Sequence, residues 1–244
     1  MSGVAWQSAG EHEVPIGNDW LTERELAWLN RMRFPKRRLE YRMARWCAKA
    51  AIARVLDPPP AIGQIEIGHL PEGAPAGYVD GLEIARRISM TDRAGWAICA
   101  IAPDGVEVGV DLELVETRSP SFVRDYFTPR EANRAGHGAD PMMANLIWSA
   151  KESALKVLRT GLRRDTRSVE VEIEDPAEDG WARLSVTGDG ITTPFPGWWR
   201  RYGLFVLTIV ADASTDPPVA LEPRPGLADA EPVHSWVSEP GPIL

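Results

Sequence analysis

The stretches Gly109-Val110-Asp111-Leu112-Glu113 and Trp148-Ser149-Ala150-Lys151-Glu152-Ser153-Ala154-Leu155-Lys156 decide the fold of this chain. The first alternates apolar and acidic residues as a half-buried strand does, so Asp111 and Glu113 point to one face. The second predicts a helix, in which Glu152 and Lys156 share a face. We expect these two elements to face each other, with three carboxylates and two lysines near the contact.

This set of residues suits a hard cation and a phosphate-rich substrate. Carboxylates that lie side by side repel one another unless a cation neutralises them. Oxygen ligands without a histidine or cysteine cluster favour Mg²⁺, and lysines favour a highly charged pyrophosphate. Two plainer interpretations stay open, namely a half-exposed edge strand with two acids and an ordinary helical Glu–Lys pair.

Working outward, the pattern of strand, helices and strands occurs twice along the chain. Helices are expected over 20–33, 35–56, 119–125, 129–135 and 142–159, the first with Thr22 and Glu25 as a capping box. Strands are expected over 65–67, 87–90, 96–102, 106–114, 169–173, 183–186 and 204–210, and a turn over 73–77. The pattern predicts an α+β fold of two similar α/β halves, related by a pseudo-two-fold axis, over 1–104 and 105–211.

Composition and charge limit the class of protein and its cellular setting. The chain of 244 residues carries a formal net charge of −8, and its stretch over 212–244 has six acids and one base. Because that stretch is also rich in proline, we expect a flexible acidic tail there. No apolar run is long enough for a membrane span, and no secretory signal opens the chain. Cys47 and Cys99 form neither a disulfide framework nor a zinc spacing, so we expect a reduced, cytoplasmic setting.

A basic block covers residues 31–54, with nine lysines and arginines against Glu40 as the single acid. Such a block attracts polyanions or acidic protein surfaces, although a solvated helix face explains it about equally well. The interpretation of the chain as a nucleic-acid-binding protein rests on this block alone. Since no recognised nucleic-acid-binding motif accompanies the block, we expect no nucleic-acid partner.

The paired motifs Gly-Val-Asp-Leu-Glu and Trp-Ser-x-Lys-Glu-Ser-x-x-Lys resemble the signature of the 4′-phosphopantetheinyl transferases. The match is strongest over residues 105–160 and weaker over 20–210. Length and layout resemble the larger, monomeric type of that family, which serves polyketide and non-ribosomal peptide synthases. The resemblance implies transfer of the phosphopantetheine arm of coenzyme A to a serine of an acyl or peptidyl carrier protein, with release of adenosine 3′,5′-bisphosphate.

The resemblance also implies roles for single residues. By match to the motif, Asp111, Glu113 and Glu152 would hold Mg²⁺, and Glu152 would act as the general base. Lys156 would contact the phosphate, with Lys151 in support. Phe122, Tyr126 and Phe127 lie on the segment that would contact the carrier protein, although plain core packing explains these three aromatic residues at least as well.

In the family, basic residues of the first half grip the 3′-phosphate of coenzyme A. Arg42 occupies the most similar position, and Arg33, Arg37 and Arg38 are further candidates. Two departures concern this nucleotide pocket. Gly73-Ala74-Pro75 lacks the lysine of the usual Gly-Lys-Pro, and Thr91-Asp92-Arg93 has an acid where a phosphate-binding histidine is usual.

Those departures raise one hypothesis about Arg93 and leave one alternative function open. Arg93 would take over the phosphate contact, with Asp92 orienting it. The alternative function is a non-catalytic relative that binds carrier protein or coenzyme A without transfer. The complete set of acids and lysines in the two motifs favours the enzyme.

Overall fold

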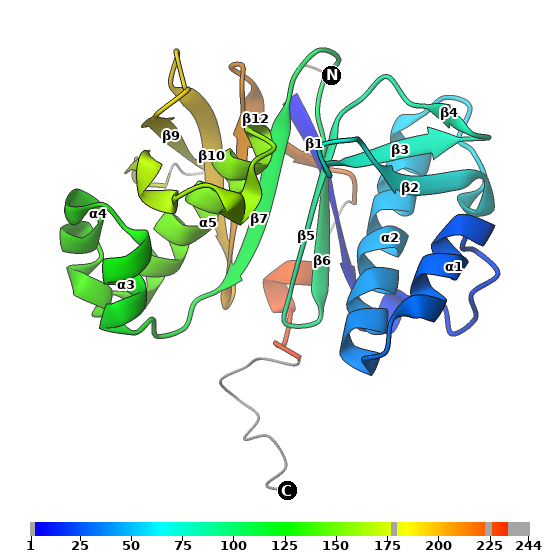
Figure 1. Cartoon of the computed structure of the whole chain (residues 1–244), viewed down its shortest axis with the longest axis horizontal. Coiled ribbons are helices and arrows are strands. Elements are labelled where there is room, and N and C mark those ends of the chain that lie inside the picture. Colours follow the sequence, from blue (N-terminus) through cyan, green and yellow to red (C-terminus); the bar gives the residue numbers. More distant parts are fainter. Residues whose placement is uncertain (1–2, 177–179, 223–225, 234–244) are drawn as a thin grey trace, which may run out of the picture.

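The computed structural model describes residues 3–176, 180–222 and 226–233 of the chain. It has the α+β fold that the sequence predicts, with two similar halves side by side (Figure 1). The first half contains β1 (Gly3–Gly10), α1 (Glu23–Arg31), α2 (Pro35–Val55), β2 (Ile65–His69), β3 (Pro75–Val79), β4 (Leu82–Glu83), β5 (Ile88–Arg93) and β6 (Trp96–Ile101). The second contains β7 (Val108–Leu114), α3 (Pro120–Tyr126), α4 (Pro129–Arg134), α5 (Pro141–Val157), β8 (Val169–Ile173), β9 (Ala182–Gly188), β10 (Phe195–Tyr202) and β11 (Phe205–Ala211).

Each half packs one long helix against its sheets. The strand orders are β12-β1-β6-β5, with β12 over Asp216–Ala220, and β2-β3-β4 in the first half, and β7-β11-β10-β9-β8 in the second. Helix α2 lies on the first set, and α5 lies on the second (Figure 1). Strand β5 of the first half runs beside β7 of the second, and the Thr91 hydroxyl donates to Asp111 across this boundary at 3.0 Å.

The same capping box opens a helix in each half. In α1, the Thr22 hydroxyl accepts from the Glu25 amide while the Glu25 carboxylate accepts from the Thr22 amide, as predicted. In α4, Thr128 and Glu131 repeat this arrangement. The two glutamates also bind a neighbouring strand, since Glu25 accepts from the Ile67 amide and Glu131 from the Val171 amide, both at 2.9 Å.

Each of these glutamates also holds a buried lysine from the long helix. The Lys49 ammonium lies 2.6 Å from Glu25, and the Lys151 ammonium lies 2.7 Å from Glu131. Neither lysine side chain has any exposed surface. Backbone carbonyls complete both sites, from Trp20 for Lys49 and from Thr166 and Val169 for Lys151. The pseudo-two-fold relation therefore extends to individual side chains.

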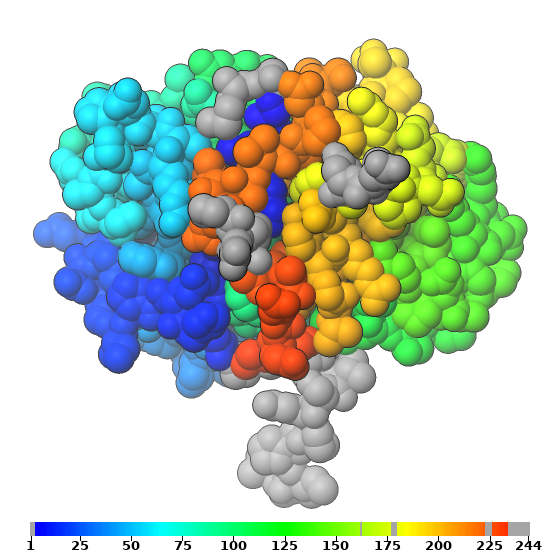
Figure 2. Space-filling model, turned by 180° about the vertical axis from the view of Figure 1, so that it is seen from behind, coloured from blue at the N-terminus to red at the C-terminus, as the bar shows by residue number. Residues whose placement is uncertain are grey.

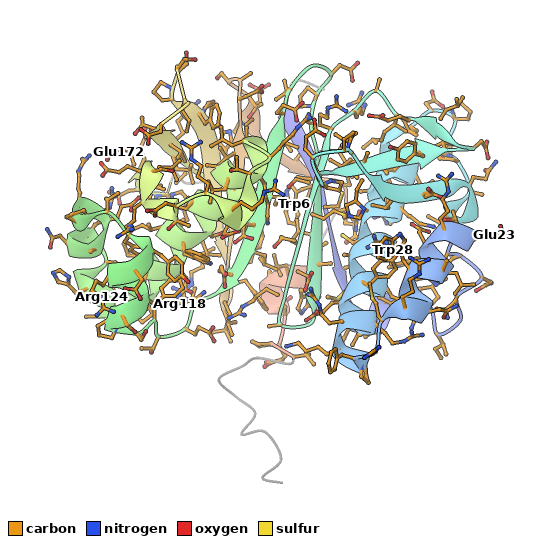
Figure 3. All side chains as sticks on the ribbon, in the orientation of Figure 1. Trp6, Glu23, Trp28, Arg118, Arg124 and Glu172 are labelled. Atoms are coloured by element: carbon orange, nitrogen blue, oxygen red, sulfur yellow. The ribbon has the colours of Figure 1, made fainter. Side chains whose placement is uncertain are left out.

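Large aromatic residues fill the interface between the halves. Trp6 of β1 contacts Trp181 and Tyr202 of the second half, with ring centroids 6.4 and 5.5 Å apart. Figure 3 shows Trp6 in the middle of the molecule. This apolar interface makes one packed body of the two halves.

Several strands of the structure are not predicted from the sequence. The sequence predicts no element over β1, yet its eight residues are all buried in the first sheet. Strand β10 was also missed, and the turn expected over 73–77 is shorter because Pro75 already begins β3. Helix α5 ends at Val157, before the expected 159, since Arg159 adopts a left-handed conformation with φ of 56°. Within the described residues, no helix is both long and apolar enough to cross a lipid bilayer.

The flexible tail expected over 212–244 requires a correction. Asp216–Ala220 forms strand β12, which pairs in parallel with β1 and so joins the sheet of the first half. Leu227 is fully buried. In Figure 2, β12 (orange) and the following described residues (red) lie on the back of the molecule between its two halves. Residues 223–225 and 234–244 of the expected tail lie outside the described residues.

Candidate active site

The strand–helix contact that the two motifs predict is present. Lys156 on α5 donates to Asp111 Oδ1 at 2.9 Å and to the Val110 carbonyl at 2.7 Å on β7. The elements approach closely because Gly109 has no side chain, and a Cβ atom there would lie 1.9 Å from the Ser153 carbonyl oxygen. The glycine of the first motif therefore lets α5 lie directly against the acids of β7.

Two carboxylates at this contact have an oxygen without a partner. Asp111 is only 6% exposed, and its Oδ1 accepts from Lys156 and Thr91 while its Oδ2 is buried and unpaired. Glu152 Oε1 is likewise buried and unpaired. Unpaired buried oxygens are costly unless a ligand satisfies them. Both atoms therefore suit an oxygen-binding cation.

Burial and repulsion raise the pKa values of two acids at this contact, Glu152 and Glu113. Desolvation, followed by the charge of Asp111, raises the pKa of Glu152 to about 7, and the same two causes raise that of Glu113 to about 7. The three acids thus act on one another electrostatically. Within the described residues, however, no three carboxylate, histidine or cysteine side chains are arranged as a ready metal site.

Glu113 differs from the other two acids because its oxygens already have partners. Trp148 Nε1 donates to Oε1 at 2.9 Å, and Arg118 donates to Oε2 at 2.9 Å. Arg93 Nε lies 3.2 Å from the same Oε2, and the Arg93 guanidinium also pairs with Glu116. Figure 3 shows Arg118 near α3, and Asn145 of α5 accepts from its Nε at 2.7 Å. The sequence analysis named neither Arg118 nor Glu116.

Lys151 does not reach this contact, contrary to its expected supporting role. It lies in the buried pair with Glu131, on another face of α5 from Glu152 and Lys156. Lys49 makes the matching pair in the half that lacks the carboxylates. We therefore assign Lys151 to the scaffold.

The predicted arginines of α2 spread over different faces of the helix. Arg42 binds the backbone carbonyls of the segment 15–17, and Arg38 binds the carbonyls of Leu29 and Met32 at the end of α1. Arg37, and Arg33 just before the helix, instead line a recess of about 660 Å³ beside α2, which is called here the arginine recess. Arg42 and Arg38 thus support the backbone, while Arg37 and Arg33 face open space.

Arg45, which the sequence analysis passed over, also lines this recess. It is 6% exposed, its guanidinium stacks 3.4 Å from the Tyr41 ring centre, and its Nε has no hydrogen-bond partner. Burial lowers its pKa. Among the described residues, no carboxylate lies within ion-pair distance of it. The Tyr-x-x-x-Arg spacing on one helix face was the available signal. A buried arginine without an acid partner is suited to an incoming anion.

Asp92 and Arg93 lie on opposite faces of β5, as neighbours on a strand do. Asp92 lines the arginine recess near Glu40, and desolvation in the recess, followed by the charge of Glu40, raises its pKa to about 6. Arg93 turns instead toward Glu113. Thr91 also faces β7, where it binds Asp111.

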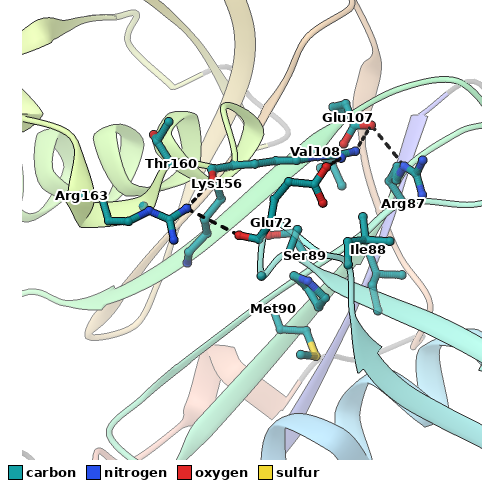
Figure 4. Close-up of a pocket in the computed structure, with 16 residues that line it drawn as sticks. Glu72, Arg87, Ile88, Ser89, Met90, Glu107, Val108, Lys156, Thr160 and Arg163 are labelled. Atoms are coloured by element: carbon teal, nitrogen blue, oxygen red, sulfur yellow. Dashed lines mark hydrogen bonds and ion pairs between the residues drawn. The ribbon is translucent and has the colours of Figure 1, made fainter.

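Lys156 lines a second recess, of about 520 Å³ (Figure 4). Its walls come from β5 with Ile88 to Met90, from the loop with Gly73 to Pro75, and from the end of α5. Along its edge, an ion pair of Arg159 with Glu72 at 3.3 Å joins the two halves, and a pair of Arg159 with Glu107 at 2.5 Å lies within the second half. The two recesses meet β5 at nearby positions, since Met90 lines the second and Asp92 lines the first.

An aromatic cluster lies next to the site. Trp148 contacts Phe122 and Tyr126, with ring centroids 4.9 and 5.1 Å apart, and Tyr126 is 39% exposed. Phe127 is buried at 3% exposure and belongs to the core. Of the three aromatic residues named from the sequence, Tyr126 therefore offers the most surface to a partner.

Known proteins resemble this chain over the region that contains this site. Residues 107–191, which include β7 and α5, match the family model described as the 4′-phosphopantetheinyl transferase superfamily. The chain is 31% identical over 192 residues to the 4′-phosphopantetheinyl transferase Svp of Streptomyces mobaraensis, with 74% of each chain covered. A holo-[acyl-carrier-protein] synthase structure from Thermotoga maritima aligns with a TM-score of 0.35 and 19% identity, over 52% of this chain and 75% of that one. On the extent and identity of the match to Svp, together with the family model, the chain belongs to the 4′-phosphopantetheinyl transferase superfamily.

Proposed function

We propose that this transferase moves the 4′-phosphopantetheine arm of coenzyme A onto a serine of an acyl or peptidyl carrier protein and releases adenosine 3′,5′-bisphosphate. The observation that carries this proposal is the contact of β7 and α5, where Lys156 meets Asp111 and two buried carboxylate oxygens lack partners. Such a site matches the charge of a pyrophosphate and its counter-ion.

The two recesses fit an elongated substrate with phosphates near its middle. Arg33, Arg37 and Arg45 would hold the 3′-phosphate in the recess beside α2. The pyrophosphate would then lie beside Lys156, which is 27% exposed and lines the second recess. Asp92 and Glu40 lie among these arginines, so their carboxyl groups limit the net positive charge there.

Asp111 and Glu152 would hold a divalent cation such as Mg²⁺ through their unpaired oxygens. Bound there, the cation would supply charge neutralisation for the pyrophosphate. Glu113 joins this set on the family motif alone, because its two oxygens already accept hydrogen bonds. Neither Lys151 nor Arg42 enters the proposal, since both bind other parts of the fold.

In the proposed reaction, the serine oxygen of the carrier attacks the phosphorus that bears the pantetheine arm. The new serine–phosphorus bond replaces the bond from that phosphorus to the bridging oxygen, which leaves with adenosine 3′,5′-bisphosphate. Glu152 takes the hydroxyl proton as the general base. Lys156 stabilises the charge that develops on the phosphate oxygens. Tyr126 and Phe122 would contact the carrier protein near the site.

Intact-mass measurement of an apo carrier protein tests this proposal directly. The carrier is incubated with the full-length chain, coenzyme A and Mg²⁺, beside Glu152→Ala and the surface control Glu172→Ala. We expect a gain of one phosphopantetheine mass with the parent chain and the control, and no gain with Glu152→Ala. No gain with several carriers, although coenzyme A still binds, would instead favour the non-catalytic relative.

A further inference from the structure

The chain returns to the first half after β11, and its last described part, residues 226–233, is called here the return segment. β12 first pairs with β1, and the Leu221 amide donates to the Trp6 carbonyl at 2.8 Å. Leu227 is then fully buried in the core between the halves. Figure 2 shows this part of the chain across the back of the molecule. The return segment is thus anchored well before its end.

The end of the return segment packs on the turn that joins β5 to β6. The Val233 amide donates to the Ala94 carbonyl at 2.8 Å. A Cβ atom on Gly95 would lie 2.7 Å from Val233 Cβ, so the two residues are in close contact. The Glu11 amide binds the other carbonyl of the turn, that of Gly95, at 2.9 Å. Both carbonyls of this two-residue turn therefore have external donors.

This turn needs such support because of its backbone conformation. Arg93 pairs with Trp96, so the loop between them is Ala94-Gly95, with φ of 48° and 83°. Two successive left-handed residues make a type I′ turn, which favours Asn-Gly or Gly-Gly. Alanine is disfavoured at the first of these positions. An outside contact that binds Ala94 thus helps to keep the turn in this form.

The turn is joined directly to a residue of the candidate site, because Arg93 immediately precedes Ala94. The Arg93 side chain leaves the turn toward β7 and pairs with Glu113 and Glu116. Glu113 in turn accepts from Trp148 of α5. A continuous series of contacts therefore leads from Val233 through the turn to the candidate active site.

We propose that the return segment is a positioning element of the active site: Val233 holds the Ala94-Gly95 turn in its left-handed form and so fixes Arg93 against Glu113. The inference rests on the proposed function for its activity readout. It gives a C-terminal residue on the back of the molecule a role in the site without any contact with substrate.

Val233→Pro in the full-length chain tests this proposal, because proline keeps an apolar side chain but lacks the amide proton. We expect about a fivefold loss of transferase kcat/KM, as for one lost hydrogen bond, and faster hydrogen exchange at the amides of the β5–β6 turn. Val233→Ala keeps the amide and should lose less than twofold. Adding Ala94→Gly, which removes the strain of the turn, should restore the Val233→Pro chain to within about twofold of the parent.

A double-mutant cycle with Arg93→Ala separates positioning from plain stabilisation. If Val233 acts through Arg93, then Val233→Pro adds no further loss of kcat/KM to the Arg93→Ala chain. Losses that multiply, or a Val233→Pro chain that Ala94→Gly does not restore, would overturn the inference. A parent chain that transfers nothing would instead overturn the proposed function, and the hydrogen-exchange comparison would still test the contact of Val233 with the turn.

Discussion

The two halves of the molecule share a scaffold and differ in the acids placed on it. Both have a capping box, a glutamate that binds a neighbouring strand, and a buried lysine on the long helix. Aligned on Lys49 and Lys151, the stretches Trp46-Cys47-Ala48-Lys49-Ala50 and Trp148-Ser149-Ala150-Lys151-Glu152 differ at their second and last positions. The acid of the helix is therefore present in the second half alone.

The central strands show the same difference. Arg54 of α2 contacts Gln7 of β1 in the way that Lys156 of α5 contacts Asp111 of β7. On this correspondence, Ala9 takes the place of Glu113. The first half thus retains the strand–helix contact without the carboxylates, and it contributes the arginine recess instead. The comparison teaches that a motif lysine can belong to the scaffold, as Lys151 does.

The largest expected effect tests the scaffold role of the two buried lysines. Lys49→Ala and Lys151→Ala should each lower the free energy of unfolding by about 3–5 kcal/mol, because each leaves a buried glutamate without its partner. Urea denaturation followed by circular dichroism measures both losses. Similar losses would strengthen the comparison, and a loss under about 1 kcal/mol for Lys151→Ala would break it.

A paired variant keeps this test informative if Lys151→Ala does not fold. Lys151→Met with Glu131→Gln removes both charges and keeps an acceptor for the Val171 amide. We expect this chain to regain most of the stability. Its transferase activity per folded molecule should stay within a few-fold of the parent, whereas a catalytic Lys151 would leave the refolded chain inactive.

The next effect concerns the arginine recess of the first half. Arg45→Ala should weaken the apparent affinity for coenzyme A about 10- to 100-fold, the range for one lost hydrogen-bonded charge contact. Arg42→Ala should change it less than about threefold, because Arg42 binds backbone carbonyls. Kinetics with 3′-dephospho-coenzyme A provide the control, since Arg45→Ala should not affect that substrate. Equal losses with both substrates would contradict the 3′-phosphate assignment.

A smaller effect, on the pH dependence of folding stability, distinguishes the second half, which contains Glu152, from the first. The pKa of Glu152 is raised from 4.5 to about 7, so the folded chain binds more protons than the unfolded chain between these values. Without metal, stability should therefore fall as pH rises from about 4.5 to 7, by about 1–3 kcal/mol. Glu152→Gln should remove much of this slope. Urea denaturation at several pH values in EDTA measures it, and a slope unchanged by Glu152→Gln would rule out this origin.

The smallest effect tests the two capping boxes. Thr22→Ala and Thr128→Ala each remove the hydroxyl that accepts from the third helical amide and donates to a strand glutamate. We expect each variant to lose about 1 kcal/mol of stability. Thermal unfolding of both proteins compares the losses directly, and losses that differ by more than about 1 kcal/mol would show that the two boxes are not equivalent.

Local sequence rules predicted the parts of the fold in which each residue type has one strong preference. The capping box of Thr22, the start of α2 at Pro35 and the shared face of Asp111 and Glu113 all follow from contacts within a few residues. The predicted contact of β7 with α5 is also present, where Lys156 donates to Asp111 and to the Val110 carbonyl.

Tertiary structure decided the features that the sequence analysis missed. Strand β1 consists largely of small and mixed residues, and it is a strand because sheet partners surround it on both sides. Arg42 and Arg45 are nearly one turn apart on the same helix, and only the packing of α2 shows which of them faces the recess. Lys151 is predicted to support catalysis because no local pattern in the sequence shows that its ammonium group pairs with Glu131.

The pairing of β12 with β1 has a consequence for biosynthesis. Strand β1 leaves the ribosome well before its parallel partner β12, which emerges only when residue 220 has left it. Until then, one side of β1 is an open edge that can pair with other chains. The N-terminal half therefore completes its sheet after the C-terminal half has been synthesised, and the two similar halves do not mature in the order of translation.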